Sequence, residues 1–463
     1  MKPCFSGLLL LIIVGTLTNC RKKDAISKYI PTDSIGLINQ WILDSMQRYS
    51  YWTSDIPNDP DYSKTPDAFF NSIRSSHDRF SWISNGTSIP QPSNSWFTYG
   101  FHYAFAQVPG YDNYIGVITF VNKNGGADRA GLQRGSYFMQ VNGMIVNHSN
   151  LDAVNQQLRS GASCRLTTAR YDNGSWKADT AVTVPAIFNT ENVITYTRSF
   201  TANGKTTGYI YYSSFDERYD NSLLGAFDKL KGAGASELIL DLRYNAGGSV
   251  ASSAKLAGMV ATTMGAADTY VILSGNRYEG RQVRSLQQVL NTSGNVYGKQ
   301  YADLQSRQLA LRRVFILTTA ATASAAELVV NALKPYLTVI QIGQTTTGKD
   351  EAGFVITDTR SPRRVFWTLE PIAYKLFNRA NEGNYAAGLT PTYMVDEMAE
   401  LPLADAGTPL DPLVKQALQL IYGSTLPVTF TNLRMSHTPV HIRTIYQSAN
   451  AQAPAGAVIN SLR

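Results

Sequence analysis

The stretch VFILTTAATASAAELVV, residues 314–330, runs from a β-rich apolar segment through small residues into a helix-forming segment. Val314 to Thr318 is expected to be a buried strand, and a helix is expected from about Ala323 to Leu333. A serine at this junction, Ser324, has its hydroxyl near the positive end of the helix and beside backbone N–H groups that lack a helical acceptor. The junction can therefore hold a nucleophile, although on this stretch alone a serine that only caps the helix is the simpler interpretation.

Strands and helices alternate on both sides of this stretch. Further strands are expected at 208–212, 237–242 and 337–342, and further helices at 221–231 and 250–263. This rhythm predicts an α/β core with a largely parallel sheet over residues 186–430. A long polar insertion is expected at 276–312, and an irregular C-terminal tail at 431–463.

A serine nucleophile needs a base, and none of the five histidines lies between residues 190 and 430. A Ser-His-Asp triad therefore cannot be built within the core. A lysine can replace histidine if burial lowers its pKa enough to make it neutral. Lys349 is the candidate, because it follows a strand and a small-residue loop at the strand's carboxyl end, where α/β sheets place their sites. Lys334, at the far end of the serine helix, is expected on the surface.

The oxyanion of such a reaction needs donors. The strand 237–242 leads into Gly247 and Gly248, whose backbone N–H groups no side chain obstructs. A flexible strand-to-helix turn is the simpler explanation of a glycine pair taken alone.

Three segments together resemble the C-terminal processing (tail-specific) peptidases: DLRYNAGG at 241–248, TASAAE at 322–327 and TTGK at 346–349. The resemblance implies a ClpP/crotonase-like catalytic core that works without a cofactor or a metal. It implies that Ser324 attacks the scissile carbonyl and that neutral Lys349 takes its proton. The N–H groups of Ala325 and of Gly247 or Gly248 would hold the oxyanion.

The sequence departs from the family pattern in two places. Ala326 stands where the serine motif usually has a second serine, which is a conservative change. Gly353 stands where many members have a glutamine that helps to hold the lysine. Lys349 must then be oriented by another group, and Gln344 and Glu351 are both candidates.

Residues 96–185 have a different character, with short β-rich runs separated by turns. Within them, ADRAGLQRGSYFMQVNG (127–143) resembles the helix–turn–strand–turn of PDZ domains, which bind a peptide by strand addition. The loop for the peptide's terminal carboxylate is expected at Tyr99, Gly100 and Phe101. The alternatives are an anonymous β-barrel, or a domain that only spaces the core from a membrane.

The N-terminal region predicts export. Residues 1–19 carry a short apolar run that is too short to span a bilayer, followed by Leu-Thr-Asn-Cys, which resembles a bacterial lipoprotein signal with Cys20 as the acylated residue. An ordinary secretory signal is the alternative. Residues 20–95 are expected to form a helical unit, with helices at 33–50 and 66–75, and then a linker rich in Ser, Pro and Asn.

Composition excludes several functions. The net charge is +7, but the basic residues form no dense stripe, so no nucleic-acid partner is expected. Of three cysteines only Cys164 lies in the folded body, so neither a disulfide framework nor a cysteine metal site can form.

The main hypothesis is a lipid-anchored serine endopeptidase of the bacterial cell envelope, on the periplasmic side of the outer membrane, that acts on the C-terminal tails of polypeptides. A non-catalytic peptide-binding lipoprotein on the same fold is the second reading, and a crotonase-like acyl-CoA enzyme is the third. The sequence leaves the oligomeric state and the natural substrate open.

Overall fold

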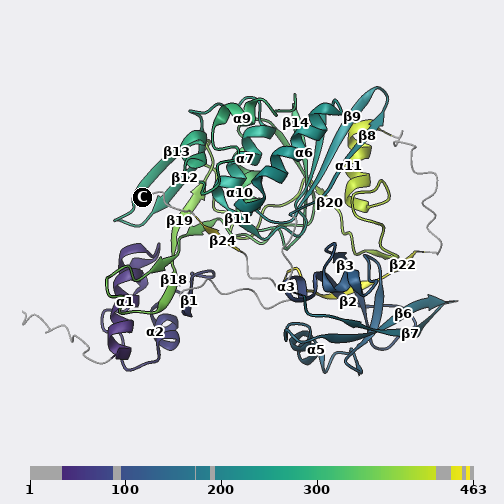
Figure 1. Ribbon diagram of the computed structural model, residues 1–463, viewed down its shortest axis with the longest axis horizontal. Coiled ribbons are helices and arrows are strands. Elements are labelled where there is room, and N and C mark those ends of the chain that lie inside the picture. The colour runs from purple at the N-terminus through teal and green to yellow at the C-terminus, as the bar shows by residue number, and fades with distance from the viewer. Residues whose placement is uncertain are drawn as a thin grey trace, which may run out of the picture.

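The structure is a computed structural model of the chain, and it describes residues 34–86, 95–172, 174–187, 193–423 and 439–450 and the backbone of strand 455–458. Its elements form an α/β core, a helical N-terminal unit and a β unit (Figure 1). The leader and Cys20 lie outside the described residues. Across the part of the chain that is described, no helix is both long enough and apolar enough to cross a membrane.

The centre of the core is a six-stranded sheet. Its strands run parallel except for the last, which pairs antiparallel with its neighbour. The predictions of a largely parallel sheet and of its four strands are thereby confirmed. In sheet order the strands are β20 (Tyr393–Met394), β15 (Thr338–Gly343), β14 (Arg313–Thr318), β10 (Glu237–Asp241), β9 (Lys205–Tyr212) and β8 (Ile194–Ala202).

Helices cover both faces of this sheet, because alternate residues of a strand point to opposite sides. On β14, Val314 and Ile316 face the cluster that holds the inner residues of α6, α7 and α10. Phe315 and Leu317 face the other cluster, which holds α11. The helices are α6 (Asp220–Gly232), α7 (Val250–Val260), α10 (Ala325–Leu333) and α11 (Pro412–Tyr422).

A second sheet flanks the core. The prediction of a polar insertion at 276–312 is wrong, because part of this region belongs to that sheet. That region contributes one strand and two short helices whose leucines Leu286, Leu290 and Leu304 are fully buried. Leu286 and Leu304 pack over Gly258 of α7. These leucines are too far apart in the sequence to form a local apolar pattern, so the sequence did not reveal them as core residues. The added elements are β13 (Arg281–Ser285), α8 (Leu286–Leu290) and α9 (Tyr301–Gln305). The sheet order is β11 (Gly247–Ser249), β24 (Ala455–Val458), β16 (Glu351–Gly353), β19 (Ile372–Phe377), β12 (Thr269–Gly275) and β13.

The N-terminal unit contains both predicted helices, α1 (Ser34–Tyr49) and α2 (Pro66–Ile73). It joins the core through β1 (Trp82–Asn85), which pairs antiparallel with β18 (Trp367–Glu370). On its other side β18 pairs with β17 (Ile356–Thr357). The N-terminal unit is thus held against residues that follow the candidate lysine in the sequence.

The β unit contains the strands predicted in 96–185, and the short helix–turn–strand of 126–141 is present. α5 (Leu151–Gln157) packs its Val154 against Tyr103 and Phe105 of the first strand in one apolar cluster. The remaining elements are α3 (Ser95–Tyr99), β2 (Phe101–Gln107), β3 (Tyr114–Val121), α4 (Gly126–Arg129), β4 (Tyr137–Val141), β5 (Met144–Ile145), β6 (Cys164–Asp172) and β7 (Ser175–Val184).

The expectation of an irregular tail at 431–463 is wrong for the described residues. Three short strands lie there, and each pairs with a segment far away in the sequence. Short strands of this kind carry too few residues for a local pattern to reveal them. They are β22 (Val440–His441), which pairs with β21 (Glu400–Leu401), β23 (Arg443–Gln447), which pairs with β2, and β24.

A buried ionic network ties the β unit to the core. Arg243 is fully buried and donates to three carboxylates, those of Asp241, Asp411 and Glu397. Glu397 also accepts from Arg134 of the β unit at 2.9 Å. Because both arginines share one carboxylate, the β unit is linked to the strand end that leads into Gly247.

Candidate active site

Ser324 lies where β14 gives way to α10, and its backbone is strained. Its φ is 57° and its ψ is −117°, a combination that residues other than glycine rarely adopt. Strain of this kind persists where the surrounding structure enforces it, and it is frequent at functional sites. In α/β-hydrolases a sharp strand-to-helix turn presents the nucleophile. The side chain is buried, and within the described residues its Oγ has no hydrogen-bond partner.

The Glu327 carboxylate joins the serine turn to the lysine loop. Its Oε2 accepts from the backbone N–H groups of Ser324 and Lys349, both at 2.8 Å. Its Oε1 accepts from the N–H of Gly348 at 2.7 Å and from the Thr346 hydroxyl. Burial raises the pKa of Glu327, and these hydrogen bonds oppose that shift. One buried side chain therefore brings the backbones of Ser324 and Lys349 to the same oxygen.

Lys349 is 1% exposed, and its Nζ lies 4.9 Å from the ring centroid of Phe80. Burial lowers the pKa of Lys349, while the carboxylates of Glu370 and Glu351 act in the opposite direction. Desolvation disfavours the charged ammonium, so the site favours the neutral amine that a general base requires.

The candidates for holding Lys349 in place of the family glutamine are engaged elsewhere. Gln344 donates to Asp396, and Glu351 Oε1 is paired with Lys375, while the buried Glu351 Oε2 has no partner among the described residues. Glu370 of β18 lies against Gly353 instead: a Cβ on Gly353 would be 3.1 Å from Glu370 Cγ and 3.3 Å from its Oε1.

Glu370 is also the carboxylate that acts most strongly on Lys349. Its Oε2 accepts from Trp82 Nε1 at 3.1 Å, whereas its buried Oε1 has no partner among the described residues. The Pro371 carbonyl and the Glu370 side chain thus fill the space that a side chain at position 353 would take.

The glycine pair lies beside the serine. A Cβ added to Gly247 would be 2.7 Å from Ser324 Cβ and 3.0 Å from the nitrogen of Ala325, so only glycine fits. The Gly247 N–H donates to Asn245 Oδ1 at 2.8 Å, which leaves it less free for an oxyanion. The Ala325 N–H occupies the first helical position, where no carbonyl of α10 can accept it. Gly248, with φ at 133°, is the neighbouring candidate.

The three residues expected to hold a peptide carboxylate are all buried. The Gly100 N–H donates to Trp96 O at 2.9 Å, because the short helix α3 ends directly before β2. The Tyr99 hydroxyl donates to Ala162 O, and Phe101 is fully buried. The contacts of β2 with residues 443–448 begin further along the strand, at Tyr103.

The N-terminal unit contributes residues that sequence reasoning missed. Phe80 covers Lys349 and Trp82 holds Glu370. Arg79 donates to Gly348 O at 3.3 Å and to Ala386 O at 3.0 Å. The compact run of polar and aromatic residues at 78–82 was the available signal, but it gave no indication of which segment it would meet.

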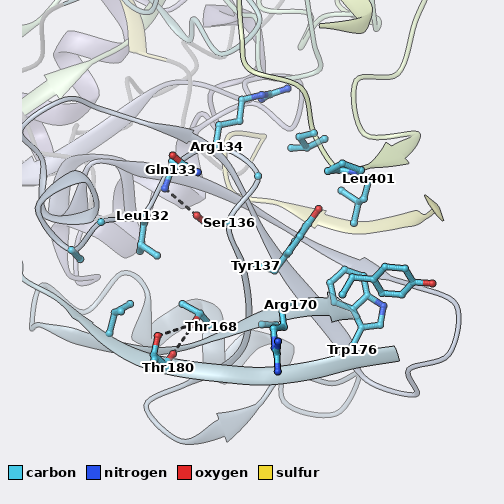
Figure 2. A pocket seen from close by; sticks show the side chains of 18 of the residues that line it. Leu132, Gln133, Arg134, Ser136, Tyr137, Thr168, Arg170, Trp176, Thr180 and Leu401 are labelled. Atoms are coloured by element: carbon cyan, nitrogen blue, oxygen red, sulfur yellow. Dashed lines mark hydrogen bonds between the residues drawn. The ribbon is translucent and has the colours of Figure 1, made fainter. Parts of the chain in front are cut away.

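A separate pocket of about 540 Å³ lies between the β unit and the segment after Met398. Figure 2 shows Leu132, Tyr137, Trp176 and Leu401 around it. Neither Ser324 nor Lys349 lines this pocket. Among the described residues no group of three or more His, Cys, Asp or Glu could hold a metal ion.

Family comparisons agree with this geometry. Residues 206–361 match the description of Peptidase family S41, and residues 37–82 match the Peptidase S41 N-terminal domain. The first match contains Gly247, Ser324 and Lys349, and the second contains Phe80 and Trp82. Two separate parts of the chain therefore resemble the two domains described for S41 peptidases.

Two relatives define how close the similarity is. The chain is 24% identical over 242 residues to carboxyl-terminal-processing peptidase 1, chloroplastic, of Arabidopsis thaliana, across 50% of this chain and 45% of that protein. It thus spans about half the length of this curated relative. A crystal structure of a Bacteroides fragilis protein assigned to the S41 proteases has a TM-score of 0.67 and 27% identity, and the match covers 86% of this chain and 99% of that chain. The mixed α/β fold is therefore that of the S41 proteases.

Proposed function

We propose that this chain is a serine-type endopeptidase that uses Ser324 as nucleophile and Lys349 as general base. The observation that carries the proposal is the shared Glu327 carboxylate, which accepts from the N–H groups of both residues. A helix cap needs no such link to a buried lysine. The strained backbone of Ser324 and the burial of Lys349 support the same roles.

The proposed reaction follows from these positions. Ser324 Oγ attacks the scissile carbonyl, and the neutral Lys349 amine takes the hydroxyl proton. The N–H groups of Ala325 and Gly248 stabilise the developing oxyanion at the positive end of α10. The lysine then gives the proton to the leaving amine, and a water molecule attacks the acyl-enzyme and regenerates the serine.

The direct test is cleavage of an unfolded protein, such as reduced casein, by the chain from residue 21 onward. Ser324→Ala should fold normally and lose cleavage, and Lys349→Arg should be as inactive as Lys349→Ala because a guanidinium cannot accept the proton. Lys334→Ala, at the exposed end of the same helix, is the matched control and should retain the wild-type rate. Cleavage by Ser324→Ala at the wild-type rate would refute the mechanism.

We also propose that the core is of the ClpP/crotonase type and that the β unit is a PDZ domain that selects substrates by their C-terminal tails. Within residues 95–184 the first strand of the β unit, β2, pairs only with β3, and its other edge pairs with β23 near the C-terminus. A peptide would add to that second edge in place of β23. One substrate should then be cut faster as a free acid than as a C-terminal amide at low concentration. Equal rates would favour a domain that acts only as a spacer.

The cellular site is proposed from the leader. Export and acylation at Cys20 would hold the enzyme at a membrane, with Arg21, Lys22 and Lys23 next to lipid head groups. Cell fractionation should find the wild type in the membrane fraction and Cys20→Ser in the soluble exported fraction. A wild type that is already soluble would contradict the anchor.

A further inference from the structure

The free edge of β2 is filled by the chain's own C-terminal strand. β23 pairs antiparallel with β2, with Gln447 opposite Ala104 and Tyr446 opposite Phe105. In the sheet order β23 comes directly before β2, so β2 would be the edge strand without it. A peptide that adds to a sheet edge makes the same kind of ladder.

Side chains make this contact specific. The Tyr446 ring lies 5.8 Å from the ring of Tyr103 and 6.1 Å from that of Phe105, measured between centroids. The Tyr446 hydroxyl accepts from Arg159, which follows α5, at 3.0 Å. Tyr446 therefore spans from the edge strand to the end of the adjacent helix.

The contact continues beyond the ladder. The Ser448 N–H donates to Tyr103 O at 2.8 Å, and the Tyr103 N–H donates to Ser448 Oγ at 2.8 Å. Ser448 and the following Ala449 are buried. Ser448 of the same chain thus hydrogen-bonds to both the N–H and the carbonyl oxygen of Tyr103.

The next described strand lies at the candidate active site. The backbone of β24 pairs in parallel with β11 on one side, with Ala455 opposite Gly247, and with β16 on the other side, with Val458 opposite Gly353 (Figure 1). β11 carries the candidate oxyanion glycines, and β16 begins two residues after Lys349. A strand between these two segments occupies backbone edges that an extended substrate could use.

We propose that β23 and β24 act as an intramolecular ligand that occupies the proposed peptide-binding edge of the β unit and the strand edges beside the candidate oxyanion glycines. This inference rests on the proposed function, because it assigns its regulation to the same site. The structure is then the closed form, in which the unpartnered Ser324 Oγ makes no hydrogen bond to the lysine. An incoming polypeptide tail must displace β23 to bind.

Competition explains how such a device works. A strand tethered to its own binding edge has an effective concentration in the millimolar range. A free peptide can bind only to those chains in which β23 has left the edge. Its apparent Kd is therefore its intrinsic Kd divided by the fraction of such open chains. Weakening β23 should raise that fraction and tighten the binding of a peptide supplied from outside. If Tyr446 only stabilised the fold, weakening it would instead reduce the affinity for the peptide.

Binding can be measured without catalysis. In the Ser324→Ala background of the full chain, a fluorescent peptide with the sequence of residues 440–449 serves as probe. Tyr446→Ala removes the ring contacts and the hydroxyl contact, and it should tighten probe binding by about tenfold. Tyr446→Phe removes only the hydroxyl contact with Arg159 and should act in the same direction by about twofold to threefold. Tyr278→Ala, an exposed tyrosine of the core, is the control and should leave binding unchanged.

The outcomes separate the two proposals. Unchanged or weaker probe binding in both folded Tyr446 variants would overturn the intramolecular ligand. If Tyr446→Ala does not fold, the Tyr446→Phe result decides. With Ser324 restored, Tyr446→Ala should also raise kcat/KM on a free-acid peptide. If the Tyr446 variants bind the probe more tightly but chains that retain Ser324 cleave no substrate, the intramolecular ligand is supported and the proposed peptidase activity is refuted.

Discussion

At the scale of single residues, the site depends on a lysine that is costly to bury. Lys349 is almost fully buried, and burial lowers its pKa from the usual value of 10.5. Between the lowered folded pKa and the unfolded value, the unfolded chain binds more protons than the folded chain. The free energy of unfolding therefore rises with pH through that window and stays at its lower level below it. The proposed base therefore reduces stability at neutral pH, as is common for functional groups.

Lys349→Met should show this cost directly. Methionine has a similar shape without a charge, so at pH 7 the variant should be more stable than the wild type by about 1–3 kcal/mol, although inactive. The difference should shrink as the pH rises toward 10.5, because a growing share of the unfolded wild-type chains then also has a neutral lysine. Urea unfolding of both proteins at pH 7 and at pH 10 measures it. A difference that does not change between pH 7 and pH 10 would mean that Lys349 stays charged in the folded protein over that range.

At the scale of elements, the serine turn and the lysine loop act as one unit through Glu327. Each oxygen of this carboxylate accepts from two donors. In Glu327→Gln the amide NH₂ must face two donors whichever way it is turned. We expect a loss of about 2–4 kcal/mol in the free energy of unfolding and at least a tenfold fall in kcat, with little change in KM.

The matched control for Glu327 removes a single donor. Thr346→Val removes the hydroxyl that donates to Glu327 and accepts from the Leu389 N–H, and it leaves the other three hydrogen bonds to Glu327 in place. Its effect on kcat should therefore be clearly smaller than that of Glu327→Gln. Chemical denaturation and steady-state kinetics on one peptide substrate compare the two. A Glu327→Gln enzyme with wild-type kcat would show that the link is not needed for catalysis.

The strand β18 supplies the second positioning group. Because the Glu370 carboxylate raises the pKa of Lys349, Glu370→Gln should lower that pKa and move the acid limb of the kcat/KM profile to lower pH. The exposed Glu400→Gln is the control and should leave the profile in place. If the limb does not move, or moves to higher pH, Glu370 does not act on the lysine.

The sequence predicted the elements of the core better than the environment of its lysine. The strands 314–318 and 237–241 and helix α10 were predicted to within about two residues, because their apolar patterns are local. Ser324, Lys349 and the glycine pair were proposed from motif spacing, and the structure places their backbones close together. Glu370 and Phe80 were not, because strand pairing between β1 and β18 brings them to the site, and no local pattern encodes that pairing.

At the scale of the whole molecule, the α/β core and the N-terminal unit meet at Lys349, and the β unit is tied to the core through Arg134 and Glu397. Phe80 belongs to the N-terminal unit, whereas Ser324 and Lys349 belong to the core. Arg79 fixes the approach of that unit by its bonds to Gly348 O and Ala386 O. The core therefore contains every reacting group but does not by itself exclude water from the lysine.

Phe80→Ala tests this dependence between the units. Removing the ring admits water to Lys349, which raises its pKa, and also removes a cation–π contact, which lowers it. The contact is worth about 0.5–2 kcal/mol, whereas full burial can shift a lysine by about 3–5 pKa units at 1.36 kcal/mol each, so the loss of burial should dominate. The acid limb of the kcat/KM profile should move to higher pH, with activity reduced at pH 7 and largely recovered at pH 9. Phe80→Leu, which keeps an apolar cover, should stay close to the wild type, and a Phe80→Ala profile that falls equally at all pH values would mean that the ring only holds the fold.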